Sequence, residues 1–308
     1  MNPWLIVLCF LAIALMRVAQ KVCSKKVSNA VAGRIFFHYG GYYNLMSALF
    51  SLITLALVGF HGFTLGTVLC ALATALCLAI ELFAGIEALK SSTLIVNQMF
   101  SVGALFIPCI VGIFFFDEPM SLWQWLGLVL FVVAMYFMVS KTGQKESEAA
   151  FHISARTVLL LVVMLLAGGG TMVAQKAFGK IVPDGNAAMY SFLMFALNAL
   201  ILYAGYGIVW LKERKKGPVA ATPAPSERLP GVLLICGLIL AFAVFVINML
   251  VTNLGKSVDS AILFSVSSAI SILITILVGA IYYKEKITWK NVVGIVLCVG
   301  ALAIINFL

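Results

Sequence analysis

The chain has few charged side chains. Only 10% of its 308 residues are Asp, Glu, Lys or Arg, whereas 63% are hydrophobic, and the mean hydropathy is +1.13. A water-soluble protein of this length cannot bury so much apolar surface, so we expect the lipid bilayer to be its solvent. The long polar segments are 141–156 and 212–228, which leaves no room for a soluble domain.

Sequence motifs for catalysis and metal binding are also missing. The three histidines (His38, His61 and His152) are far apart, and the chain has no HExxH, no P-loop and no CxxC. Its seven cysteines show no metal-ligand spacing, and we interpret them as small apolar residues in the spans. We therefore expect no enzyme activity, no catalytic residue, no metal site and no cofactor.

Long apolar runs take up most of the sequence. Each is long enough to cross a bilayer as a helix and too continuous for an alternating barrel strand. The predicted fold is an all-α polytopic membrane protein with ten transmembrane helices. We place them at 3–20, 38–59, 66–89, 93–115, 122–140, 157–178, 186–210, 230–253, 259–282 and 290–308.

The formal net charge of +9 has an explanation that does not need a nucleic acid. With the N-terminus outside the cell, nearly all lysines and arginines fall at the cytoplasmic ends and loops, as the positive-inside rule requires. The exceptions are Lys176, Lys180 and Lys256. We therefore predict that both termini lie outside and that the partners are the lipid bilayer and a small molecule, with no nucleic acid.

Two parts of the sequence repeat. The phrase VAQK occurs at 18–21 and at 173–176, and FFFDEPMSLWQWLGLVL (114–130) aligns with IYYKEKITWKNVVGIVL (281–297). This order predicts two five-helix copies at 1–140 and 157–308, joined by a linker at 141–156. Because five is odd, the second copy enters the membrane from the other side, which makes an inverted repeat suited to alternating access.

The chain resembles the ten-helix EamA-type transporters of the drug/metabolite transporter superfamily. The matching residues are Glu118, Ser121 and Gly127 in the first copy, and Glu285, Thr288 and Gly294 in the second. The resemblance implies a cavity formed by the first four helices of each half, with the fifth helices at the periphery. We interpret Glu118 and Glu285 as charges near helix starts rather than as functional carboxylates.

Glu81 is the acidic residue deepest in a predicted span, where a charge costs at least about 2.5–3.5 kcal/mol and so needs a reason. Small residues at helical spacing share its face. Two interpretations remain open. Glu81 either binds a cation or a proton in the cavity, or pairs with a basic residue such as Arg17 as part of the structure.

Other polar residues on the cavity-forming helices are candidates for substrate binding. They are Tyr43, Asn44, Asn97, Tyr190, Asn198, Asn248, Ser265 and Ser268. Lys21 and Lys176 are equivalent positions in the repeat, and we expect them to be gate residues near opposite membrane faces, with Glu87 as a candidate partner of Lys21.

The function that the resemblance implies is secondary transport of a small metabolite or drug by alternating access. It implies export with proton or exchange coupling, in a bacterial inner membrane. Two alternatives remain: an antiporter of anionic metabolites, such as nucleotide sugars or sugar phosphates, and a membrane receptor or assembly protein that does not transport. The sequence does not indicate the oligomeric state.

Overall fold

The structure is a computed structural model that describes residues 3–115, 121–139, 154–182, 184–215, 229–254, 260–284 and 289–307. These residues form helices and short turns, with no strand among them. The helices are α1 (Pro3–Ser28), α2 (Arg34–Val58), α3 (Leu65–Ser91), α4 (Leu94–Gly103), α5 (Phe106–Phe115), α6 (Leu122–Val139), α7 (Ala155–Ile181), α8 (Ala187–Lys215), α9 (Gly231–Leu254), α10 (Ser260–Ile281) and α11 (Trp289–Phe307).

The fold is that of an all-α polytopic membrane protein, as predicted. Within the described ranges, six helical stretches are long and apolar enough to cross a bilayer. They are Arg34–Val58, Leu65–Ser91, Leu94–Phe115, Ala155–Ile181, Ala187–Arg214 and Gly231–Val251. Each predicted apolar run coincides with one helix except 93–115, which contains α4 and α5.

Side-chain caps mark the starts of three helices. The hydroxyl oxygens of Thr64, Thr93 and Ser154 each accept a hydrogen bond from the backbone N–H three residues later, at 3.2 Å. These bonds satisfy donors that the first turn of a helix leaves open. Helices α3, α4 and α7 all contribute to the polar site described below, and the caps fix where those helices begin.

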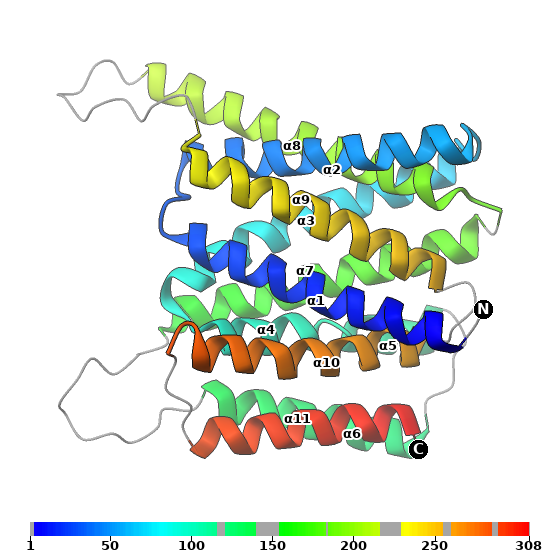
Figure 1. Ribbon diagram of the computed structural model, residues 1–308, viewed down its shortest axis with the longest axis vertical. Helices are drawn as coiled ribbons and strands as arrows, with labels where there is room; N and C mark the ends of the chain where they lie inside the picture. Colours follow the sequence, from blue (N-terminus) through cyan, green and yellow to red (C-terminus); the bar gives the residue numbers. More distant parts are fainter. Residues whose placement is uncertain are drawn as a thin grey trace.

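The helices lie side by side with their axes roughly parallel, and both chain termini are at the same end of the bundle (Figure 1). Lys25, close to the end of α1, donates a hydrogen bond to the carbonyl of Leu89, close to the end of α3 (2.9 Å). Gly66, at the start of α3, packs instead on Val182, directly after α7. Helices α1 and α7 therefore run in opposite directions.

The contacts between helices can be compared with those that two inverted copies would make. If α1, α2, α3, α4–α5 and α6 correspond to α7, α8, α9, α10 and α11, then the α3–α7 contact corresponds to the contact of α9 with α1. Both contacts are extensive, as are the corresponding contacts of α3 with α8 and of α9 with α2. Helix α2 also packs closely on its own counterpart α8, and α6 on its counterpart α11.

Helices α6 and α11 form one edge of the molecule (Figure 1). They pack on each other and reach the rest of the bundle through contacts with α4 and α10. Their outer side chains, including Val129, Val132 and Tyr136, are exposed and apolar or aromatic, which suits contact with lipid. This peripheral position agrees with the resemblance, and it leaves the remaining helices to enclose the centre.

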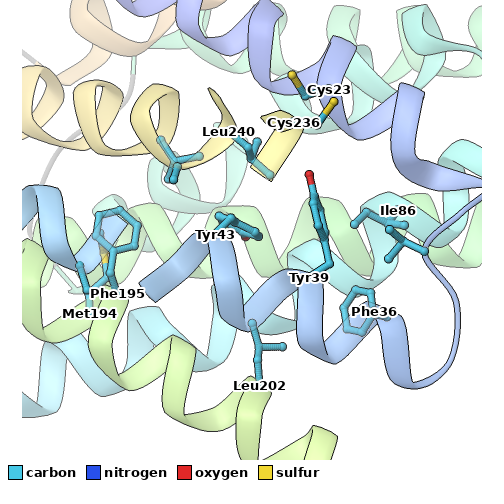
Figure 2. Packing of buried hydrophobic residues seen from close by; sticks show 14 of the residues in the cluster. Cys23, Phe36, Tyr39, Tyr43, Ile86, Met194, Phe195, Leu202, Cys236 and Leu240 are labelled. Carbon is cyan, nitrogen blue, oxygen red and sulfur yellow. The ribbon is translucent and has the colours of Figure 1, made fainter. Parts of the chain in front are cut away.

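Buried apolar side chains form two main clusters. One joins α2, α8 and α9 with the ends of α1 and α3, and the other joins α4, α5, α6, α7, α10 and α11. In the first cluster, Tyr39 points toward Cys23 on α1 and Cys236 on α9 (Figure 2). These cysteines are buried free thiols, as expected of small apolar residues. The polar residues of the centre lie between the two clusters.

Candidate functional site

Two adjoining cavities lie at the centre of the bundle, with volumes of about 60 and 120 Å³. They share five lining residues from α1, α3 and α9: Gln20, Lys21, Leu78, Glu81 and Val244. The smaller cavity extends toward α2 and the larger one toward α4, α7 and the end of α9. Both copies of the predicted repeat therefore contribute to the lining.

Three ionisable side chains face this space. Arg17 and Lys21 are one helical turn apart on α1 and so lie on the same face. Glu81 comes from the middle of α3, and its electrostatic partners are Lys21 and Arg17. Lys21 Nζ also donates a hydrogen bond to Asn97 Oδ1 on α4 at 2.9 Å. One carboxylate and two cations therefore meet in the middle of the bundle.

Glycines on α7 allow the helices around Glu81 to approach closely. A Cβ added to Gly168 would be 3.3 Å from the Glu81 carboxyl carbon and 3.2 Å from Ala104 Cβ. At Gly169, the added atom would be 2.3 Å from Ile107 Cβ. No larger residue fits between these helices without moving them, so the glycines are close-packing points.

The contact with α7 falls at the break between α4 and α5. Pro108 has no N–H to donate to the carbonyl of Ala104, which instead accepts from Ile107 N at 3.2 Å, in a tighter turn. Ala104 and Ser101 line the larger cavity. The sequence predicts one helix over 93–115, and the structure divides it at the wall of the cavity.

Side-chain amides surround the charged group. Gln175 Nε2 on α7 donates to Asn248 Oδ1 on α9 at 2.6 Å, and Asn248 Nδ2 donates to the Val244 carbonyl at 2.8 Å. Gln98 lines the larger cavity and is 3% exposed, and its Oε1 has no hydrogen-bond partner among the described residues. A buried acceptor of this kind is energetically costly unless a donor reaches it.

Six of the residues that the sequence nominates come together at these cavities. They are Lys21, Tyr43, Asn44, Glu81, Asn97 and Asn248. Two other predicted residues line neither cavity. Asn198 donates to Asn44 Oδ1 at 3.2 Å, and the hydroxyl of Tyr190 is 2.6 Å from that of Thr74. Asn198 and Tyr190 therefore support the lining and are not part of it.

Lys21 lines both central cavities, whereas Lys176 lines neither, and their helices α1 and α7 run in opposite directions. Their role as gates stays a prediction. The suggested pairing of Lys21 with Glu87 is wrong, because Glu87 forms its salt bridge with Lys90. The side chains of Ser265 and Ser268, together with Glu118, Glu285 and Thr288, lie outside the described residues.

The sequence analysis did not nominate three glutamines that line the cavities: Gln20, Gln98 and Gln175. Two of them could have been found. Gln20 and Gln175 are the third letters of the two VAQK phrases, so the repeated phrase itself pointed to residues of the cavity lining. Gln98 follows Asn97 directly, and nothing in the sequence distinguishes it.

The comparisons with known proteins identify the family. The model of the EamA-like transporter family matches residues 156–307. The chain belongs to the EamA-like transporter family. Members of this family are membrane transporters, so the chain is a membrane transporter, which supports the expectation that it is not an enzyme.

Among solved structures, 26 chains match, and one of them is described as "Crystal structure of protein". It is 10% identical in sequence, with a TM-score of 0.58 over 98% of this chain and 96% of that one. At this identity the match shows a shared fold over nearly the whole length. No curated protein matches.

Proposed function

We propose that this EamA-like transporter moves a small polar metabolite by alternating access, with the two central cavities as its substrate site. The observation that carries the proposal is the group of charges formed by Arg17, Lys21 and Glu81. These residues line cavities that helices of both proposed halves enclose. A charge inside a membrane is costly, and such residues commonly mark a substrate or ion pathway. The family resemblance implies export, driven by a proton or by exchange.

The packing of the helices supports alternating access. Corresponding pairs of helices from the two proposed copies make corresponding contacts, and α1 and α7 run in opposite directions. Two such copies can exchange conformations, which opens a central site first to one side and then to the other. The divided helix α4–α5 at the cavity wall is a feature that such carriers use to place polar backbone near a substrate.

The size of the site favours a metabolite over a drug. Cavities that hold drug-sized ligands have volumes of roughly 300–1,000 Å³. The two cavities here, at about 60 and 120 Å³, are much smaller. Their lining of amides and charges also offers hydrogen-bond partners to a polar solute. The proposed cargo is therefore a compact, polar molecule.

Counterflow in proteoliposomes tests this proposal. Compounds that raise the melting temperature of the purified protein are first selected from a panel of metabolites. Vesicles loaded with such a compound should then take up its labelled form transiently above equilibrium, which a channel or a receptor does not produce. Glu81→Gln should lower this uptake at least about tenfold, because the empty carrier is left with two buried cations, Arg17 and Lys21, that have no counter-ion between turnovers.

Glu87→Gln is the matched control, because Glu87 is on the same helix and pairs with Lys90 outside the cavities. It should transport at the wild-type rate. Absence of counterflow for every stabilising compound would contradict the proposal, as would equal losses in the two variants.

A further inference from the structure

The charges at the centre of the bundle are unbalanced. Among the described residues, Glu81 is the one carboxylate that lines either cavity, whereas Arg17 and Lys21 are both cationic. The other helices around the cavities do not correct this. Helices α4, α5, α9 and α10 contain no Asp, Glu, Lys or Arg at all.

More distant charges on the described parts of α3 and α7 do not supply the missing negative charge. On α3, Glu87 is paired with Lys90, and on α7 the charged residues within the helix are Arg156, Lys176 and Lys180, which are all basic. With Glu81 ionised, the site has an excess of one positive charge in a region where water is scarce.

The cost of this excess charge depends on what enters the site. A monoanion would make the total charge zero, a zwitterion would leave it at +1, and a cation would raise it to +2. Unbalanced charge is strongly disfavoured in a low-dielectric interior. Arg17 adds geometric preference, because its planar guanidinium can form paired hydrogen bonds with a carboxylate.

The buried amide of Gln98 adds a second requirement. Gln98 lines the larger cavity, and its buried Oε1 has no hydrogen-bond partner among the described residues. A ligand with a hydroxyl group would donate to this oxygen and remove the cost of leaving it unpaired.

From these observations we infer that the substrate is a small hydroxy acid, bound through its carboxylate to Arg17 and Lys21 and through its hydroxyl to Gln98. This inference rests on the proposed function and specifies its substrate class. Glu81 then has a different role from the cation site suggested by the sequence. It is the internal counter-ion of the two cations, and it competes with the substrate's carboxylate for them.

Binding to the purified full-length protein tests the inference. The probes are lactate, glycerate and 3-hydroxybutyrate, each compared with its amide and with the amino alcohol of the same carbon skeleton. At up to about 10 mM, at least one acid should raise the melting temperature, whereas its amide and amine should not. Stabilisation by the amines, or by none of the acids, would overturn the inference.

Variants of the cations assign the effect to the site. Arg17→Gln and Lys21→Gln should each weaken binding of the acid at least about tenfold. Lys26→Gln, at an exposed position on the same helix, should leave it unchanged. Glu81→Gln removes the competing carboxylate, so it should bind the acid several-fold more tightly. Weaker binding by Glu81→Gln, or undiminished binding by both cation variants, would contradict the inference.

Two further experiments separate the possible causes of a negative result. Arg17→Lys and Lys21→Arg retain the charges, so they should bind the acid even if a glutamine variant fails to fold. Counterflow of the same probes separates the two proposals. Acids that bind but are not carried would refute transport alone, whereas counterflow of the amines would refute the substrate class and leave transport intact.

Discussion

Replacing Gly169 by alanine should destabilise the protein through a single added methyl group. The new Cβ would be 2.3 Å from both Cβ and Cγ1 of Ile107 and 3.0 Å from the carbonyl oxygen of Ala104. Two of these three are backbone or backbone-attached atoms and cannot rotate away. To relieve the clash, α7 must move away from the α4–α5 break.

The magnitude follows from two opposing effects. Overpacking a close contact costs about 1–3 kcal/mol. Alanine in place of glycine inside a helix would otherwise contribute about 0.5–1 kcal/mol of stability. Because the contact at Gly169 is well inside normal separations, we expect the clash to dominate, with a net loss of about 1–2 kcal/mol in the free energy of unfolding. Ligand affinity should fall too, since the same contact shapes the larger cavity.

Gly179 provides a control on the same helix. A Cβ there meets nothing within 4 Å, so Gly179→Ala should be neutral or stabilising. Reversible denaturation of the two variants in detergent micelles measures the difference. If Gly169→Ala is as stable as Gly179→Ala, the close approach of α7 to the α4–α5 break is wrong.

Two further predictions concern orientation and the cavity wall. In a cysteine-free background, an impermeant thiol reagent added to intact cells should label a single cysteine at position 2 but not one at position 220, and labelling of 220 but not 2 would reverse the topology. Tyr190→Phe removes the hydrogen bond with Thr74, whose hydroxyl keeps its bond to the Cys70 carbonyl, so unfolding should become easier by about 1 kcal/mol with counterflow unchanged. A loss of counterflow in a stable Tyr190→Phe protein would place that hydroxyl in the site.

The helices could be predicted well because their signal is local. Length and hydropathy alone locate them, and a basic residue such as Lys284 or Lys90 near a helix end marks the side that it faces. The break at Ala104 was harder to predict. Pro108 lacks the N–H that would bond to the Ala104 carbonyl and so predicts a disturbance there, whereas the close packing of Gly169 against Ile107 at the break depends on a distant helix.

The site could be predicted only in part, because it depends on contacts between distant helices. Glu81 stands out as an acidic residue inside an apolar run, and the sequence correctly offered Arg17 as a partner. It offered Glu87 as the partner of Lys21, whereas the structure has Asn97, because this contact depends on the rotation of α1 against α3 and α4.

Access to the cavity from the two sides of the membrane tests the central claim most directly. Ser101 lines the larger cavity, whereas Ser51 is fully buried on α2 and lines neither cavity. In a background without the seven native cysteines, Ser101→Cys should react with an impermeant thiol reagent added to either side of sealed vesicles, and a transported solute should slow both reactions. Ser51→Cys should react from neither side. Labelling of Ser101→Cys from one side alone, with and without solute, would contradict alternating access at this site.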